Sequence, residues 1–119
     1  LLMAADIDYD TFESPKPMHQ AIDMGERIHI FYHNNDSALT ISEKTKNAFN
    51  RLGKWGAKNS ITLQDDVLEA DVTEVEDKDG FPPFEWVNHW YYLNSREVIE
   101  DIIRILRGEE SIYTEDFPT

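Results

Sequence analysis

The sequence contains no cysteine, which excludes disulfide bonds, thiol catalysis and metal sites built on thiolates. It also lacks a run of about 20 apolar residues, so we expect no transmembrane helix, and it shows no secretory signal. Basic residues are scarce, since 11 lysines and arginines stand against 24 aspartates and glutamates and give a formal net charge of −13. A surface this acidic repels phosphate groups, so we expect neither nucleic acid nor an anionic membrane as a partner.

What remains is the composition of one globular domain, with 119 residues of which 40% are hydrophobic. A chain of this length buries about two-thirds of the surface that it exposes when unfolded. The sequence opens on the apolar run LLMAA, which is typical of a buried strand. Because natural termini rarely fall inside such strands, we expect the chain to be a fragment whose fold continues in a missing N-terminal portion.

Strand-like and helix-like patterns alternate along the chain. Apolar runs predict strands over 1–5 and 27–33, with a short one over 61–63. Alternation predicts a half-exposed edge strand over 67–75, in which Glu69 faces outward.

Apolar residues at helical spacing predict three helices between and after these strands. They are expected over 18–24, over 38–52 with Gly53 as the stop, and over 95–107 with Asn94 as the cap and Gly108 as the stop. The last of them has an apolar face made of Val98, Ile99, Ile102, Ile103 and Leu106. The order of strands and helices predicts an α/β fold with a parallel sheet, whose strand carboxyl ends form the ligand-binding edge.

An acid follows the second predicted strand, and a histidine lies shortly before the last predicted helix. This order, Asp36 and then His89, matches two of the three residues of a charge-oriented hydrolytic triad, in which a carboxylate orients an imidazole and the imidazole activates a serine. The 119 residues contain no G-x-S-x-G motif that would supply this serine. Two simpler interpretations stay open, with Asp36 as a helix N-cap and His89 as a loop histidine beside packed aromatic residues.

Four stretches carry a family resemblance: AADID at 4–8, HNNDSAL at 33–39, RLG at 51–53 and HWYY at 89–92. Together they resemble a group of largely uncharacterised α/β-hydrolases that are similar to serine esterases and lipases. The resemblance covers most of the chain and corresponds to the last three strand–helix units of that doubly wound, mainly parallel fold. It implies that residues 1–108 are the C-terminal part of an α/β-hydrolase domain, followed by an acidic tail over 109–119.

The resemblance also implies roles for individual residues. It makes Asp36 the triad acid and His89 the general base, with a serine supplied by the missing N-terminal portion. Asp6, Asp8 and Trp90 would lie near the site but outside the triad. The implied substrate is a small carboxylic ester or a related acyl compound, and we expect no cofactor and no metal.

The acids at the end of the first strand also invite comparison with two other motifs. A calcium loop beginning at Asp6 fails because its sixth and twelfth positions would be Thr11 and Pro17 instead of glycine and glutamate. The phosphatase motif D-x-D-x-T is incomplete, because Asp10 stands where threonine is required. We therefore expect an acidic strand exit with turns stabilised by the Asp side chains.

Histidines and aromatic residues near the predicted site have alternative interpretations as well. A two-histidine, one-carboxylate metal site would need His33, Asp36 and His89, but no ligand spacing supports it. His29 and His33 share one face of the predicted strand, and we interpret both as packing histidines with satisfied hydrogen bonds. The aromatic residues either wall an apolar acyl pocket or pack their loop down: Phe84, Trp86, Trp90, Tyr91 and Tyr92.

A second hypothesis for the whole chain is a non-catalytic interaction domain built on half of this fold. A sheet without its neighbouring strands exposes an edge and part of a face, so such a domain needs a covering partner. A second copy of the chain, forming a homo-oligomer, would serve. Ester hydrolysis and self-association distinguish the two hypotheses.

Overall fold

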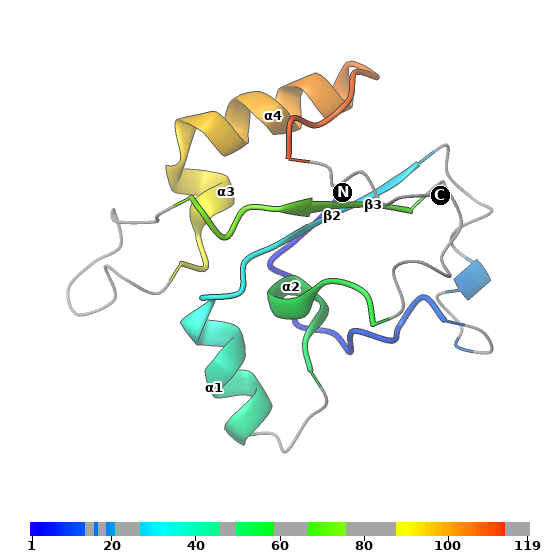
Figure 1. Ribbon diagram of the computed structural model, residues 1–119, viewed down its shortest axis with the longest axis vertical. Helices are drawn as coiled ribbons and strands as arrows, with labels where there is room; N and C mark the ends of the chain where they lie inside the picture. The colour runs from blue at the N-terminus through cyan, green and yellow to red at the C-terminus, as the bar shows by residue number, and fades with distance from the viewer. Residues whose placement is uncertain are drawn as a thin grey trace.

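The computed structural model describes residues 1–13, 16, 19–20, 27–45, 50–58, 67–75 and 88–113. Its elements are β1 (Leu2–Met3), β2 (Ile28–Tyr32), α1 (Ser37–Thr45), α2 (Leu52–Trp55), β3 (Val67–Asp71), α3 (Tyr91–Asn94) and α4 (Arg96–Leu106) (Figure 1). The predicted strand over 61–63 lies outside the described residues, as does the predicted helix over 18–24 apart from residues 19 and 20.

The three strands form one parallel sheet in the order β1-β2-β3. Leu2 is paired with Ile30, and Ile28 is paired with Val67, so β2 lies between the other two. Among the described strands β3 is therefore at an edge, as its alternating pattern predicted. Parallel strands need crossover connections and end at the same side of the sheet, so the segments that follow β2 and β3 are brought together there. The predicted α/β class and parallel sheet are confirmed.

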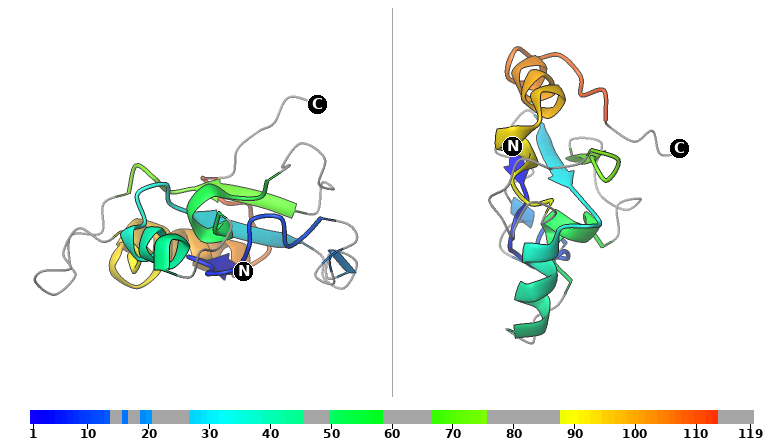
Figure 2. Two further views of the ribbon diagram at one scale, coloured as in Figure 1. Left: turned by 90° about the horizontal axis from the view of Figure 1, so that it is seen from below. Right: turned by 90° about the vertical axis from the view of Figure 1, so that its left-hand side faces the viewer.

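Two hydrophobic clusters, one on each face, hold the sheet between its helices. Because side chains alternate along a strand, Ile30 and Phe31 point to opposite faces of β2. Phe31 packs with residues of α3 and α4, in a cluster of Ala4, Phe31, Ala70, Val72, Tyr91 and Val98. Ile30 packs with residues in and near α2, in a cluster of Phe12, Ile30, Leu52 and Ala57. Figures 1 and 2 show the same layers, with α4 on one side of the strands and α1 and α2 on the other.

The expected helix over 38–52 is divided in two, and its predicted stop at Gly53 is wrong. α1 ends at Thr45, and α2 begins at Leu52 after an extended Arg51. Gly53 lies inside α2, where a Cβ atom would come within 2.3 Å of the Ala5 nitrogen. The absence of a side chain thus allows α2 to approach the end of β1, where the Gly53 N–H donates to the Ala5 carbonyl at 2.9 Å.

The first strand is shorter than expected, with two paired residues in place of five. Its extended backbone ends at Ala4, which has a positive φ of 49°. In β3 the outward orientation expected for Glu69 is also wrong. This side chain is 4% exposed, and its Oε1 accepts a hydrogen bond from the Ala57 N–H at 2.7 Å. A buried carboxylate paired with a backbone amide avoids the cost of an unsatisfied polar group.

The last helix begins one residue later than expected. Ser95, not Asn94, is its N-cap and accepts a hydrogen bond from the Val98 N–H at 3.3 Å. Asn94 instead ends the short helix α3, which the sequence pattern did not predict. Gly108 follows the helix with a φ of 86°, and this left-handed residue stops it as expected.

The apolar face of α4 is only partly buried. Val98 is buried and Ile102 packs against the same core, but Ile99, Ile103 and Leu106 are exposed. No helix in the described part of the chain is long and apolar enough to cross a membrane. α4 itself has 11 residues.

Candidate active site

Asp36 lies in the turn between β2 and α1, at the carboxyl end of the central strand. Its side chain is fully buried. Its Oδ1 accepts a hydrogen bond from the Leu39 N–H at 3.0 Å, which is the bond expected of a helix N-cap. Its backbone N–H donates to the His33 carbonyl at 3.1 Å, so the turn itself is closed by a hydrogen bond. The cap interpretation of Asp36 is therefore correct, and it accounts for one carboxylate oxygen.

The second carboxylate oxygen contacts His89. Asp36 Oδ2 lies 2.7 Å from His89 Nδ1, although the two residues are 53 positions apart. An ionised carboxylate only accepts hydrogen bonds, so Nδ1 carries the proton, and in the neutral ring Nε2 is the basic nitrogen. The His89 side chain is 21% exposed, whereas the Asp36 side chain is not exposed at all. A buried acid thus orients a histidine that is accessible from outside.

The segment that carries His89 is fixed to the sheet by Tyr91. The Tyr91 hydroxyl accepts a hydrogen bond from the Ala4 N–H at 3.0 Å and donates to the Phe31 carbonyl at 3.2 Å. Burial raises the pKa of Tyr91, so the side chain stays a neutral phenol. Its two bonds join α3 to β2 and to the residue that follows β1. Asn88, just before His89, has a positive φ of 57°, which asparagine tolerates better than most residues.

Trp90 follows His89 directly and meets its ring edge to face, with the ring centroids 5.8 Å apart. Tyr91 and Tyr92 make a similar contact at 5.7 Å. Tyr91 is buried in the core, so it packs the segment down and does not wall a pocket. Phe84 and Trp86 lie outside the described residues.

His33 is a buried histidine close to this pair, and the sequence predicted it to be a packing histidine with satisfied hydrogen bonds. Its Nδ1 accepts from the Asn35 N–H at 3.1 Å, and its Nε2 lies 2.7 Å from the Val75 carbonyl. Both ring nitrogens are thus occupied, as expected of a packing histidine. The metal interpretation finds no support, because the described residues contain no group of three acidic or histidine side chains that could hold an ion.

Asp6 and Asp8, the two acids expected near the site, are bound to Arg51. The Arg51 guanidinium lies 2.6 Å from Asp8 Oδ1 and 3.4 Å from Asp6 Oδ1. Asp6 also accepts a hydrogen bond from Ser42 of α1 at 2.8 Å. These contacts connect the exit of β1 to α1 and to the start of α2. They fit the expected acidic strand exit, with the positive charge supplied by a buried arginine.

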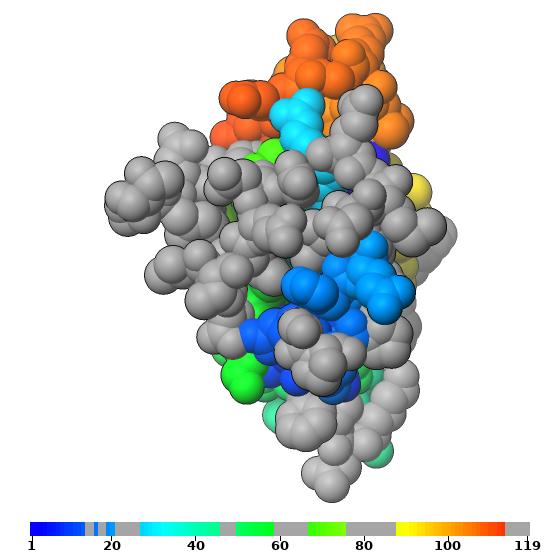
Figure 3. All heavy atoms as spheres, turned by 90° about the vertical axis from the view of Figure 1, so that its right-hand side faces the viewer, coloured from blue at the N-terminus to red at the C-terminus, as the bar shows by residue number. Residues whose placement is uncertain are grey.

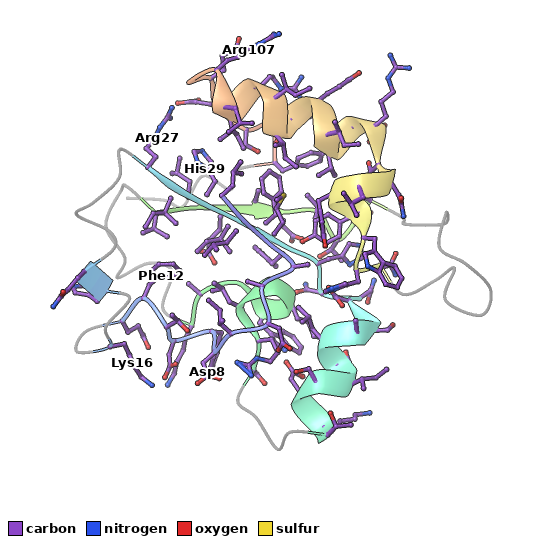
Figure 4. The ribbon with its side chains drawn as sticks, turned by 180° about the vertical axis from the view of Figure 1, so that it is seen from behind. Asp8, Phe12, Lys16, Arg27, His29 and Arg107 are labelled. Carbon is purple, nitrogen blue, oxygen red and sulfur yellow. The ribbon has the colours of Figure 1, made fainter. Side chains whose placement is uncertain are left out.

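Backbone contacts join the same two segments. Tyr9 N–H donates to the Asn50 carbonyl at 2.8 Å, and Lys58 N–H donates to the Tyr9 carbonyl at 3.0 Å. Figure 3 shows the N-terminal segment, in blue, lying beside green residues that flank α2. Asp8 and Lys16 point away from the sheet on this side of the molecule (Figure 4).

His29 differs from the satisfied packing histidine that was expected. It is 4% exposed and lies on the α4 face of β2, opposite Phe12 (Figure 4). Its Nε2 has no hydrogen-bond partner among the described residues. Burial, and to a lesser extent the charge of Arg27, lowers the pKa of His29. The ring is therefore held neutral within the core.

Comparison with known proteins identifies the fold. A family described as alpha/beta hydrolase of unknown function (DUF900) matches residues 1–107, which is most of the chain. Neither a curated protein nor a solved structure matches the chain. The family match confirms the resemblance that the four sequence stretches indicated.

Proposed function

Because the chain belongs to the family of alpha/beta hydrolases of unknown function (DUF900), we propose that Asp36 and His89 are the acid and the general base of a serine-hydrolase triad. The observation that carries the proposal is the 2.7 Å hydrogen bond between Asp36 Oδ2 and His89 Nδ1. In this bond Nδ1 donates to the carboxylate, as the mechanism requires, and the carboxylate thus fixes the tautomer in which Nε2 is basic.

The reaction follows from this tautomer. His89 Nε2 takes the proton of a serine hydroxyl while the serine oxygen attacks the carbonyl carbon of an ester or related acyl compound. The imidazolium formed is stabilised by the Asp36 carboxylate and then gives its proton to the leaving alkoxide. Water, activated by the same histidine, hydrolyses the acyl-enzyme. These 119 residues contain no G-x-S-x-G motif, so the serine and the oxyanion hole belong to a segment outside them.

Two features support a pre-formed site. Asp36 has no exposed surface, and in such a low-dielectric position its charge acts on His89 with little screening by water. Its other oxygen, Oδ1, is held by the Leu39 N–H, so the carboxylate does not need to reorient when the imidazolium forms.

We further assign residues 1–108 to the C-terminal part of the hydrolase domain and 109–119 to an acidic tail. Trp90 is proposed to border the acyl side of the site, because its ring meets His89 edge to face. Asp6 and Asp8 are proposed to support the site from outside the triad, through the Arg51 ion pairs at the start of α2 and the hydrogen bond from Ser42 of α1 to Asp6.

A second candidate function is that of a non-catalytic interaction domain, and the exposed face of α4 favours it. Ile99, Ile103 and Leu106 recur at helical spacing with exposures of 36%, 42% and 72%. A covering partner, including a second copy of the chain, would bury this face. A protein that self-associates but hydrolyses no ester would support this candidate over the hydrolase.

The test uses the full-length protein that contains this sequence and a fluorophosphonate probe, which labels activated serines. We expect labelling of one serine that lies outside these 119 residues, identified by mass spectrometry of the modified peptide. His89→Ala should abolish labelling and lower the hydrolysis of p-nitrophenyl butyrate by at least about 10³-fold. His19→Ala is the matched control, because that ring bonds to the Phe12 carbonyl, away from Asp36. Unchanged labelling in His89→Ala would contradict the proposal.

A further inference from the structure

We propose that His33 is a positioning residue for the Asp36–His89 pair, acting as a neutral imidazole locked in one tautomer that fixes the turn presenting Asp36. The inference deepens the proposed hydrolase function and rests on it for its kinetic consequences. Its structural basis, however, is a set of hydrogen bonds that can be observed without any turnover.

The hydrogen bonds of His33 determine its tautomer. Nδ1 accepts a hydrogen bond from the Asn35 N–H at 3.1 Å, so Nδ1 itself carries no proton. In a neutral ring the single proton is then on Nε2, which donates to the Val75 carbonyl at 2.7 Å. The side chain is 1% exposed, so water is not available to replace either partner.

The same residue also binds the turn through its backbone. Its carbonyl accepts from the Asp36 N–H at 3.1 Å, and its N–H donates to the Gly53 carbonyl at 3.0 Å. The two N–H groups at 35 and 36 are thus both held by His33, one by the ring and one by the carbonyl. This arrangement fixes the backbone from which the Asp36 side chain extends.

The ring of His33 also contacts the segment that carries the base. It stacks on Tyr91 with the centroids 5.8 Å apart and the ring planes inclined by 30°. Tyr91 lies two residues after His89 and is itself bonded to Ala4 and to Phe31 of β2. His33 therefore touches both sides of the Asp36–His89 hydrogen bond, and a change in the ring is transmitted to the distance between acid and base.

The Nδ1 acceptor and the Nε2 donor can be tested separately. In His33→Asn, the side-chain oxygen replaces Nδ1 as the acceptor for the Asn35 N–H and the bond to Val75 is lost. In His33→Gln, the terminal amide replaces the Nε2 donor, and the turn loses its acceptor. The two variants differ little in size and polarity, so each is the matched control for the other.

The experiment uses the full-length protein and long-range ¹H–¹⁵N NMR spectra of its histidine rings. In the wild type we expect a neutral His33 with the proton on Nε2, and a downfield Nδ1 proton on His89 from its bond to Asp36. His33→Asn should keep that His89 signal, and His33→Gln should shift or broaden it. A His33 proton on Nδ1 in the wild type, or an unchanged His89 signal in His33→Gln, would overturn the inference.

Kinetics with p-nitrophenyl butyrate give the second readout. We expect His33→Gln to lower kcat by about 10- to 100-fold at unchanged KM, and His33→Asn to stay within about threefold of the wild type. Equal losses in both variants, in proportion to their thermal midpoints, would mean a merely structural role and would overturn the inference. A wild type without ester hydrolysis would refute the proposed function alone, because the NMR result would still decide whether His33 positions the pair.

Discussion

The carboxylate of Asp36 binds His89 and caps α1 at the same time. Oδ2 lies 2.7 Å from His89 Nδ1, while Oδ1 accepts from the Leu39 N–H at 3.0 Å. The two interpretations that the sequence offered for this acid are therefore compatible, because each uses a different oxygen. The cap bond to α1 holds the carboxylate in the orientation in which it meets the histidine.

Asp36→Asn should separate these two contacts. The amide oxygen can still accept from Leu39, so we expect the free energy of unfolding to change by less than about 1 kcal/mol. The amide nitrogen cannot accept from His89 Nδ1, so the histidine loses the tautomer with a basic Nε2, and kcat for an ester should fall by about 10³- to 10⁴-fold. Urea denaturation and steady-state kinetics measure the two effects. Glu100→Gln on the exposed side of α4 is the control, and both values should stay unchanged there.

Tyr91→Phe should destabilise the protein by about 1–3 kcal/mol, because it leaves the buried Ala4 N–H and Phe31 carbonyl without their partner. Urea denaturation measures the change. Tyr92→Phe removes a hydroxyl from the neighbouring, partly buried ring and should cost less than about 0.5 kcal/mol. Equal costs for the two variants would show that the hydroxyl bridge from α3 to the strands contributes nothing to stability.

Gly53→Ala should be destabilising by about 1–3 kcal/mol or more, because the new Cβ would lie 2.3 Å from backbone nitrogen at Ala5. Backbone cannot move aside as a flexible side chain can. Gly108→Ala is the comparison: its Cβ meets nothing within 4 Å, but its φ of 86° should still cost about 1 kcal/mol. Thermal or chemical denaturation should rank Gly53→Ala as the more harmful. The reverse order would argue against the close packing of α2 on β1.

His29 should make stability depend on pH. Burial lowers its folded-state pKa below the unfolded value of 6.5, with Arg27 acting in the same direction and Asp101 of α4 opposing it. The contribution of His29 to the free energy of unfolding is therefore fully present above pH 6.5. It is lost as the pH falls from 6.5 through the lowered pKa, because the unfolded chain then binds a proton that the folded protein does not. Denaturation at several pH values between 5 and 8 should show a shallower decline for His29→Leu than for the wild type. A His29→Leu curve parallel to the wild type would contradict the assignment.

The sequence was a good guide where local pattern and parallel topology decide the outcome. An apolar run located β2, an alternating pattern located β3, and the strand–helix order predicted the parallel sheet, which brings Asp36 and His89 to one end. Gly108 ended its helix as expected, because a left-handed residue after a helix is a local feature.

The sequence was a poor guide where contacts between distant segments determine the structure. Gly53 looked like a helix stop, yet its role is the approach of α2 to Ala5, which no local pattern encodes. The alternating pattern placed Glu69 on the outward side of its strand, yet the side chain is buried and its carboxylate accepts a hydrogen bond from the Ala57 N–H. His33 has the satisfied hydrogen bonds that were expected of a packing histidine, but the sequence did not predict that its ring also holds the turn that presents Asp36. Its place directly after β2 and three residues before the acid was the available signal.

The central claim, that Asp36 acts through His89, is tested most directly by a double-mutant cycle in the full-length protein. The rates of p-nitrophenyl butyrate hydrolysis are measured for wild type, Asp36→Asn, His89→Ala and the double variant. If the two residues work as one unit, the double variant should be no slower than His89→Ala, within about threefold. A double variant slowed by the product of the two single effects, or a His89→Ala variant as active as the wild type, would contradict the account.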